Sequence, residues 1–240
     1  MDASLISTHR GGSAPADPII KLSDVHLSLA SRAGTVDILR GIDLEIAKGL
    51  SVGIVGPSGS GKTTLLMAIG GLERITRGTI QVAGHELARM SEDALARFRR
   101  DNVGIVFQSF HLIATMTALE NVAVPLEFRG VDDAFERARR ELLAVGLGHR
   151  LDHYPGQLSG GEQQRVAIAR AVAAGAAMVM ADEPTGNLDQ QTGQEIMDLL
   201  FALSRDQGTT LLLVTHDRQL AESCDRVIEI RDGRITANAQ

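Results

Sequence analysis

The residues best suited to chemistry form a glycine-rich segment that ends in lysine and threonine. The segment follows the pattern G-x-x-x-x-G-K-[ST], and its members are Gly56, Pro57, Ser58, Gly59, Ser60, Gly61, Lys62, Thr63 and Thr64. Glycines let successive backbone N–H groups turn toward phosphate oxygens, and the lysine can reach the β- and γ-phosphates of a nucleotide. The Thr63 hydroxyl can ligate Mg²⁺, so the segment predicts a site for a nucleoside triphosphate with magnesium.

The flanking sequence supplies the elements that must position such a loop. An apolar run at residues 50–55 precedes it and is typical of a parallel strand buried on both faces. Apolar residues at 65–69 follow and predict a helix, whose N-terminus adds partial positive charge beside the phosphates. A glycine-rich turn alone could be a plain tight connection. Strand, loop and helix in this order favour phosphate binding instead.

Two acidic residues follow a second apolar strand, which is predicted at residues 178–180. Asp182 is placed to hold Mg²⁺, directly or through water, because a carboxylate at a strand end can reach the metal that bridges the phosphates. Glu183 is the candidate general base that polarises the attacking water. Two solvated acids in a turn are the alternative interpretation, which the phosphate loop upstream makes the weaker one. Together the two motifs predict hydrolysis of the triphosphate.

A third motif lies between these two, with the sequence LSGGEQQR at residues 158–165. Ser159 can cap the helix that is predicted to follow it, and the two glycines leave that helix's first backbone donors open. The helix start is therefore a second candidate anion site, although an ordinary serine-glycine helix start has the same composition. A simple nucleotide hydrolase of this size does not need a second phosphate site in one chain.

Hydrophobic periodicity predicts the remaining elements of an α/β fold. Nearly alternate apolar residues at 20–29 and 42–46 are typical of half-buried antiparallel strands, and residues 78–84 are expected in the same sheet. Ser91 is the predicted N-cap of one helix, and the acidic pair at 132–133 is that of another. Further strands are predicted at 103–107 and 210–215, a helix at 192–206 and a closing hairpin at 227–235.

Composition limits the possible partners of the chain. Its 240 residues carry 24 basic and 30 acidic side chains, a net charge of −6, which does not suit a nucleic-acid binder. No apolar run approaches the ~20 residues that cross a bilayer, so no direct membrane insertion is expected. Residues 1–17 are rich in Ser, Gly, Ala and Pro and are predicted to be a disordered tail. The folded domain is expected at 18–240.

In their order along the chain these motifs resemble those of the ATP-binding-cassette (ABC) ATPases, over about residues 19–235. The resemblance implies a P-loop NTPase (RecA-like) core with an antiparallel β-subdomain and a helical signature subdomain at about 109–169. Gln108 looks like the Q-loop glutamine, expected near Mg²⁺ and the attacking water and at the contact with a membrane subunit. Asp189, in Asn-Leu-Asp, looks like the D-loop aspartate. His216 looks like the switch histidine that holds the γ-phosphate.

The resemblance also implies an ATP-driven homodimer with two shared nucleotide sites. Each ATP, with its Mg²⁺, would lie between the phosphate loop of one chain and the signature residues of the other, namely Ser159, Gly160, Gly161 and Glu162. A polyanion shared by two clusters of donors stabilises the closed pair until the γ-phosphate leaves. Leu29 stands about where the family usually stacks an aromatic ring on adenine. The residues therefore predict nucleotide binding more firmly than a choice of ATP over GTP.

Residues 107–122 and 181–189 resemble one branch of the family, the lipoprotein-export (LolD) and macrolide-export (MacB) ATPases and their relative YbbA. That branch implies a cytoplasmic ATPase subunit on the inner face of the bacterial cytoplasmic membrane. Its partner would be an integral membrane permease of the MacB/FtsX type on a separate chain, and its cargo lipoprotein or other hydrophobic substrates. The alternative is a non-transport, FtsE-like ATPase that regulates a membrane or cell-wall complex. The transported molecule, the permease and the direction of transport are not predicted.

Overall fold

A computed structural model describes residues 18–31 and 34–239, which form two β-sheets and the helices between and around them. The predicted disordered tail at 1–17 lies outside the described residues. A four-stranded sheet has the strand order β2-β1-β4-β5, and a six-stranded sheet has the order β10-β9-β3-β8-β7-β6. The mixture of antiparallel and parallel sheets confirms the predicted α/β fold class.

The antiparallel sheet comprises β1 (Ile20–Ser31), β2 (Gly34–Ile46), β4 (Arg77–Val82) and the short β5 (His85–Glu86). Strand β1 pairs with β2 and β4 on its two sides. The alternation seen in the sequence places one face of each strand in the core, because successive side chains point to opposite faces. The buried face includes Ile20, Leu22, Leu27, Ile42, Leu44 and Ile46.

The second sheet is parallel in its centre. Strands β3 (Ser51–Val55), β8 (Thr210–Val214), β7 (Met178–Asp182) and β6 (Val103–Phe107) run parallel to one another. The predicted C-terminal hairpin is confirmed as β9 (Arg226–Arg231) and β10 (Arg234–Ala239), and β9 pairs in parallel with β3. The carboxyl ends of the parallel strands therefore share one edge, where a ligand site is expected in such sheets.

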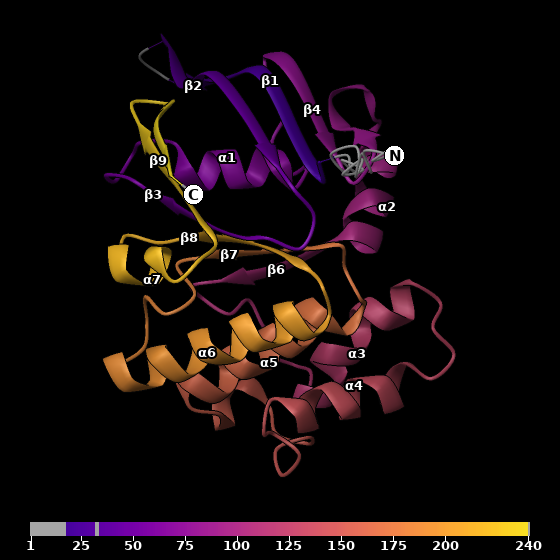
Figure 1. The fold of residues 1–240 in the computed structure, drawn as a ribbon. Coiled ribbons are helices and arrows are strands. Elements are labelled where there is room, and N and C mark those ends of the chain that lie inside the picture. Colours follow the sequence, from indigo (N-terminus) through magenta and orange to yellow (C-terminus); the bar gives the residue numbers. More distant parts are fainter. Residues whose placement is uncertain (1–17, 32–33, 240) are drawn as a thin grey trace, which may run out of the picture.

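Helices occupy both sides of the parallel sheet (Figure 1). Helix α1 (Lys62–Ile69) lies between the two sheets, whereas α5 (Gly160–Ala173) and α6 (Gln190–Asp206) cover the opposite face. Helix α5 lies close to β6 because Gly104 has no side chain: a Cβ there would be 2.2 Å from the carbonyl oxygen of Ala171. The remaining helical elements on this body are α2 (Glu92–Asn102), α7 (Arg218–Glu222) and the 3₁₀ turn at Leu87–Arg89.

A second hydrophobic core lies within the region that was expected to be helical. Helices α3 (Ala118–Phe128) and α4 (Ala134–Ala144) pack with α5, and a 3₁₀ turn at Pro155–Gln157 precedes α5. This core contains Val122, Leu126, Ala138, Leu142, Leu158 and Val166. The prediction that the acids at 132–133 cap α4 is wrong in its detail. Asp133 occupies the N-cap without a capping hydrogen bond, and its carboxylate instead accepts from Arg140 at 3.1 Å.

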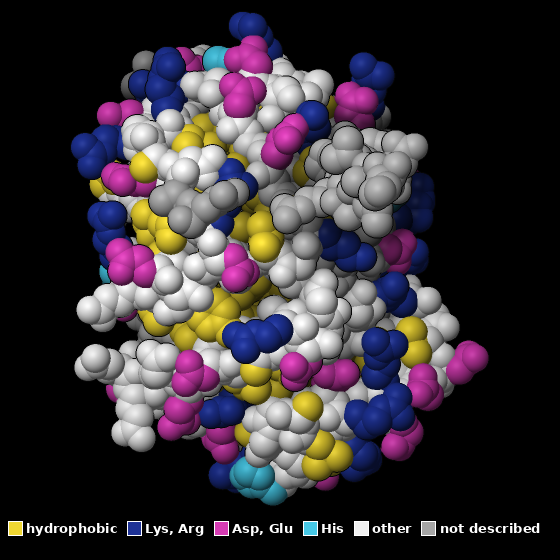
Figure 2. Space-filling view, viewed as in Figure 1, with side chains coloured by type: hydrophobic (Ala, Val, Ile, Leu, Met, Phe, Trp, Pro, Cys, Tyr) yellow, Lys and Arg dark blue, Asp and Glu magenta, His cyan; other side chains and the backbone are white. Residues whose placement is uncertain are grey.

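The surface is charged and mixed in sign. On the face shown in Figure 2, basic and acidic side chains are interspersed, and hydrophobic ones gather in the middle of the view. Within residues 18–31 and 34–239, none of the helices has the length and apolar character needed to span a membrane.

Candidate active site

The phosphate loop joins β3 to α1 through backbone conformations that favour glycine. The φ angles are 151° at Gly56, 77° at Gly59 and 100° at Gly61. A Cβ on Gly56 would also lie 2.0 Å from the carbonyl oxygen of Ile230, so β9 approaches the loop too closely for any side chain. The Ser60 hydroxyl is buried and has no hydrogen-bond partner in the described part of the chain. Buried polar groups are normally paired, so Ser60 is an exception within the loop.

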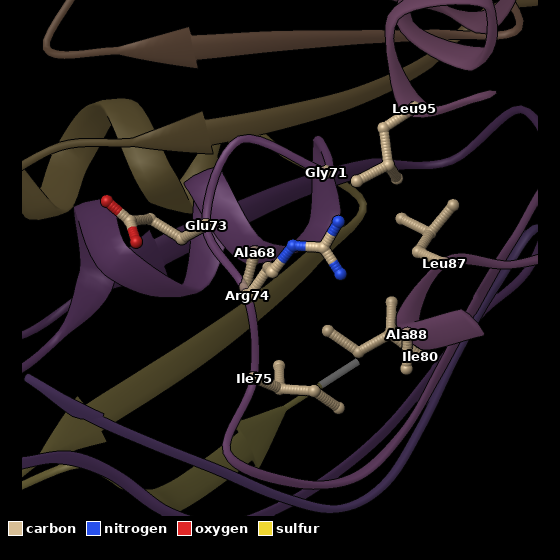
Figure 3. A pocket seen from close by; sticks show the side chains of 9 residues that line it. All are labelled: Ala68, Gly71, Glu73, Arg74, Ile75, Ile80, Leu87, Ala88 and Leu95. Carbon is tan, nitrogen blue, oxygen red and sulfur yellow. The ribbon is translucent and has the colours of Figure 1, made fainter. Parts of the chain in front are cut away.

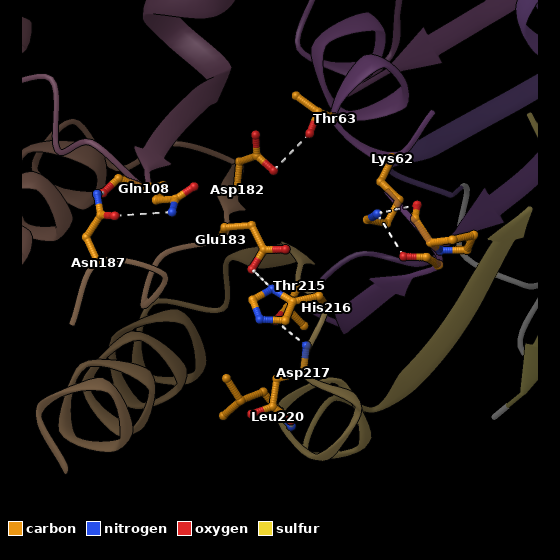
Figure 4. Close-up of polar contacts among 12 residues, drawn as sticks. Lys62, Thr63, Gln108, Asp182, Glu183, Asn187, Thr215, His216, Asp217 and Leu220 are labelled. Carbon is orange, nitrogen blue, oxygen red and sulfur yellow. Dashed lines mark hydrogen bonds and ion pairs between the residues drawn. The ribbon is translucent and has the colours of Figure 1, made fainter. Parts of the chain in front are cut away.

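Lys62 begins α1 and folds back over the loop, as Figure 4 shows. Its Nζ donates to the carbonyl oxygens of Gly56 at 2.9 Å and Pro57 at 3.0 Å. Phosphate oxygens are stronger acceptors for an ammonium group than neutral carbonyls are, because both partners are charged. The ammonium is thus held beside the loop, where the phosphate oxygens of a bound triphosphate can replace the two carbonyls as its hydrogen-bond acceptors.

Thr63 and Asp182 bring two oxygen ligands together from α1 and β7. The Thr63 hydroxyl donates to Oδ1 of Asp182 at 3.2 Å. Burial raises the pKa of Asp182, and the hydrogen bond from Thr63 partly opposes that shift. Among the described residues there is no cluster of three or more His, Cys, Asp or Glu that could hold a metal. A hydroxyl and one carboxylate fit Mg²⁺, which commonly takes its other ligands from phosphates and water.

Glu183 and His216 face each other across the ends of β7 and β8. Nδ1 of His216 lies 2.9 Å from Oε2 of Glu183, and the His216 side chain is 78% exposed against 22% for Glu183. Nδ1 thus faces the carboxylate, while most of the imidazole side chain is open to solvent. Glu183 itself has a left-handed backbone with φ 46°, and its N–H donates to the carbonyl of Val214 at 2.9 Å.

Gln108 follows β6 and is held by a residue for which sequence reasoning gave no role. Its Nε2 donates to Oδ1 of Asn187 at 3.3 Å, and Nδ2 of Asn187 donates to the Gln108 carbonyl at 3.0 Å. Phe107, the preceding residue, is in register with Asp182 on the neighbouring strand. Gln108 therefore follows the strand that neighbours Asp182, and its role near Mg²⁺ and the attacking water stays a prediction. In the sequence, the only indication that Asn187 belongs to the site is its position in the Asn-Leu-Asp segment.

The signature residues form a capping box at the start of α5. The Ser159 hydroxyl accepts from the backbone N–H of Glu162 at 3.3 Å, and Oε2 of Glu162 accepts from the backbone N–H of Ser159 at 2.8 Å. Oε1 of Glu162 accepts from Nε of Arg150 at 2.8 Å, a contact without a sequence signal. The Ser159 N–H and then Arg150 hold the pKa of Glu162 below its usual range. The carboxylate of Glu162 thus orients the helix start within its own chain.

Asp189 caps the next helix, α6. Its Oδ1 accepts from the backbone N–H of Thr192 at 3.0 Å and its Oδ2 from the Thr192 hydroxyl at 2.6 Å. The Thr192 hydroxyl and N–H lower the pKa of Asp189, so the residue is ionised at neutral pH. Asp189 is thus a helix cap that carries a negative charge at the end of the 187–189 segment.

Leu29, where an aromatic ring would be usual, lies on β1 and pairs across the sheet with Val36 of β2. Both side chains are about half exposed, at 43% and 47%. They form an aliphatic surface patch on the antiparallel sheet. Such a patch offers a base apolar contact without the quadrupole of an aromatic ring.

A separate cavity lies behind α1, between β4 and α2 (Figure 3). Its volume is about 60 Å³, and its wall is mostly apolar: Ala68, Gly71, Ile75, Ile80, Leu87, Ala88 and Leu95. Arg74, which pairs with Glu92 at 2.6 Å, also lines it and extends toward Gly71 and Leu87, whereas the Glu73 side chain points away. The space holds no more than a few water molecules, so it does not compete with the phosphate loop as a nucleotide site.

Comparison with known proteins identifies the family. The model of the ABC transporter family matches residues 39–186, which is more than half of the chain and includes the phosphate loop, the signature and the acidic pair. The chain therefore belongs to the ABC transporter family and is of its ATP-binding, ATP-hydrolysing type. This confirms the predicted family and the predicted ATPase activity.

The chain is also similar to whole and partial relatives. It is 48% identical over 227 residues to YbbA, an ABC transporter ATP-binding protein of Escherichia coli K12, covering 94% of this chain and 100% of YbbA. It is 48% identical to the macrolide export ATP-binding/permease protein MacB 1 of Aeromonas hydrophila, covering 92% of this chain. The chain spans only 34% of the length of that MacB protein. The predicted resemblance to the LolD, MacB and YbbA branch is thus confirmed.

A solved structure shows the same fold. The ATP-binding cassette MJ0796, described as a dimer in a post-hydrolysis state bound to ADP and Pi, superposes with a TM-score of 0.85 at 39% identity. The match covers 92% of this chain and 98% of that one. The predicted ABC cassette fold is confirmed, and the likeness supports nucleotide binding and dimer formation by cassettes of this kind.

Proposed function

We propose that two copies of this chain clamp two ATP molecules, each with Mg²⁺, and separate after hydrolysis. Each triphosphate lies between the loop at 56–63 of one copy and the residues 159–161 of the other. The observation that carries the proposal is the presence of two glycine-containing helix starts in one chain: one at α1, which follows the loop and has Gly61 as its N-cap, and one at α5, capped by Ser159. Helix starts of this kind suit anions. The dimeric state described for MJ0796 supports it.

The residues at the carboxyl edge of the parallel sheet divide the chemistry among them. Lys62 and the loop N–H groups bind the β- and γ-phosphates, and Thr63, Asp182 and Gln108 hold Mg²⁺ and its water. The bound metal supplies charge neutralisation between the phosphates. Glu183 accepts the proton of the attacking water, and His216 contacts the γ-phosphate. To act as the base, Glu183 must release His216 and contact the attacking water instead. The γ-phosphate provides His216 with a new partner, and its arrival therefore frees Glu183.

A groove beside β6 supplies the site for a membrane partner. Its volume is about 370 Å³, and its apolar wall includes Phe107, Ile113, Val124, Pro125 and Phe128, from β6, the following loop and α3. Phe128 is 73% exposed, and the groove begins next to Gln108. A segment of a separate permease chain fits this groove, because exposed apolar surface of this kind marks protein interaction sites. The MacB relatives support that partner, since their name joins ATP-binding and permease functions.

We infer that the protein acts at the inner face of the bacterial cytoplasmic membrane and drives a separate permease, and the groove and the MacB relatives support this inference. The macrolide export named for MacB supports a hydrophobic cargo, such as a lipoprotein or an amphipathic small molecule, moved outward. Purification from membranes separates this function from an FtsE-like one. Recovery with a permease supports transport, whereas recovery with a cell-wall regulator or with a purely soluble partner overturns it.

The shared nucleotide site is tested by Ser159→Arg. The arginine projects from the start of α5 into the space that the proposal gives to the partner's γ-phosphate. We expect the variant to bind ATP as a monomer with unchanged affinity and to form no ATP-dependent dimer by light scattering. Lys62→Ala is the matched control, because it should weaken binding to the monomer itself. An ATP-dependent dimer of Ser159→Arg overturns the shared site.

A further inference from the structure

The Arg170 guanidinium occupies an unusual environment near the end of α5. It forms no ion pair with any carboxylate in the described residues. Instead, Nη1 donates to the carbonyl of His111 at 2.6 Å and Nη2 to that of Phe110 at 2.8 Å. Burial lowers the pKa of Arg170, and the side chain is partly buried where it lines the groove beside β6. The partners that hold this partly buried charge are therefore two backbone carbonyls of one turn, a geometry that fixes the turn relative to α5.

The two carbonyls belong to a strained turn. Phe110 and His111 both have left-handed backbones, with φ of 59° and 48°. This conformation costs roughly 1–2 kcal/mol for each residue with a Cβ, and strain of this kind persists where surrounding contacts enforce it. The ring of His111 also packs edge-on against Phe107, with centroids 4.6 Å apart. The fork of Arg170 spans two successive carbonyls, which a single-point donor such as lysine does not match.

The turn lies two residues beyond Gln108, the residue proposed to attend Mg²⁺ and the attacking water. Asn187 holds Gln108 from one side, through both its side chain and its carbonyl. Arg170 holds the turn at Phe110 and His111, which follows Gln108 in the chain. Helix α5 is a single element of 14 residues, about 21 Å long, that carries Ser159 at one end and Arg170 near the other. One helix therefore connects the signature serine to the turn beside Gln108.

We propose that Arg170 is a positioning residue that sets the turn at Phe110 and His111, and through it Gln108, in register with the signature helix. Engagement of Ser159 by the partner's nucleotide then aligns Gln108 in the same chain. Hydrolysis at one site thereby depends on occupation of the other. The inference rests on the proposed role of Gln108 and on the shared nucleotide site. Its first test, however, requires neither.

The first test is backbone hydrogen exchange of the nucleotide-free protein. Arg170→Met should raise exchange at residues 109–113 by about tenfold, because the turn loses both of its donors. Arg99→Met is the matched control, since Nη1 of Arg99 donates to the carbonyl of Gly71 at 2.6 Å, away from this turn. Unchanged exchange at 109–113 in Arg170→Met, or an equal rise in Arg99→Met, overturns the proposal. If Arg170→Met does not fold, Arg170→Lys carries the same expectation.

The second test is a double-mutant cycle on ATP turnover. Arg170→Met should lower kcat roughly 10- to 100-fold and change the ATP affinity of the monomer by less than about twofold, since it misplaces a group without touching the phosphate loop. Arg170→Met with Gln108→Ala should be no slower than Gln108→Ala alone, because both act through one residue. Additive losses in kcat overturn the positioning role. A Gln108→Ala variant of normal kcat refutes the role of Gln108 instead and leaves the exchange test to decide on Arg170.

Discussion

At the scale of single residues, the candidate site is held in a resting arrangement by contacts that a nucleotide must replace. Lys62 donates to two carbonyls of its own loop, Thr63 donates to Asp182, and His216 contacts Glu183. Each of these groups already points into the space where phosphate, metal and water are proposed to bind. Little side-chain reorganisation is then needed on binding, which lowers the entropic cost of assembling the site.

The base role of Glu183 predicts a separation of binding from hydrolysis. Glu183→Gln keeps an oxygen that can contact His216 and removes the negative charge, so the phosphate loop is undisturbed. We expect ATP-dependent dimers to accumulate while turnover falls by about 10²- to 10⁴-fold. Light scattering and phosphate release measure the two effects. Normal turnover in this variant would show that Glu183 is not the base. Glu195→Gln is the control, because it also removes one acidic side chain, on the surface of α6, and should leave turnover unchanged.

The candidate residues of the site could be predicted from the sequence because they stand in short, continuous motifs. A phosphate loop is continuous in the chain, and the acidic pair follows its own strand, so 56–64, Asp182 and Glu183 were identified. The partners that fix these residues come from distant positions and have no such pattern. Asn187 meets Gln108 across 79 positions and Arg170 meets Phe110 across 60, contacts that exist only once the sheet and α5 are packed.

At the scale of elements, α5 is central to the site. Its first turn carries the signature, its middle contributes buried Gln164, whose Nε2 donates to the carbonyl of Pro184 at 2.6 Å, and its last turn carries Arg170. Pro184 follows Glu183 directly. The helix therefore contacts both the segment of the base and the segment of Gln108, and its N-terminal cap determines how the signature is presented.

The cap of α5 predicts a stability effect that depends on pH. The pKa of Glu162 in the folded chain lies below its ordinary value of 4.5, owing first to the Ser159 N–H. A lowered pKa contributes stability above pH 4.5 that is lost as the pH falls through the folded value. Glu162→Gln keeps the amide oxygen as a cap but removes the charge. We expect it to lower stability by roughly 0.5–1 kcal/mol at pH 7 and by progressively less as the pH falls below 4.5.

Thermal unfolding of both proteins across that pH range measures the effect. Glu195→Gln, which removes an acid from the surface pair with Arg165, should cost less than about 0.5 kcal/mol at pH 7. A constant difference between Glu162→Gln and the unaltered chain from pH 7 to pH 3 would contradict the charged cap.

Element type could be predicted well where periodicity was strong, and poorly where the backbone is irregular. The parallel strands and α5 match their predicted ranges because long apolar runs and a serine cap specify them locally. The stretch between Gln108 and α3 was interpreted as helical, yet it contains the left-handed turn at Phe110 and His111. Phenylalanine does not favour that conformation, and the turn is held by Arg170, which donates to both of its carbonyls from another element. The sequence next to the turn therefore gave no sign of it.

At the scale of the whole molecule, two bodies meet beside the active site. The sheets and α1 form one core, and α3, α4 and α5 form a second, with the groove of Phe107, Pro125 and Phe128 between β6 and α3. Arg170 and His111 also line this groove. A permease segment seated there would touch the turn that positions Gln108, so binding of the partner and hydrolysis of ATP are expected to influence each other.

The groove predicts a variant that uncouples the ATPase from its permease. Phe128→Ser removes the most exposed aromatic side chain of the groove, and because Phe128 is already 73% exposed the fold should lose less than about 0.5 kcal/mol. We expect basal ATPase activity to stay within twofold while co-purification with the permease from membranes is lost. Phe135→Ser is the matched control, since Phe135 is 44% exposed on α4 and does not line the groove. If Phe128→Ser still co-purifies with the permease and Phe135→Ser does not, the partner binds the α4 side of the second core, and Arg170 and His111 lie away from the permease contact.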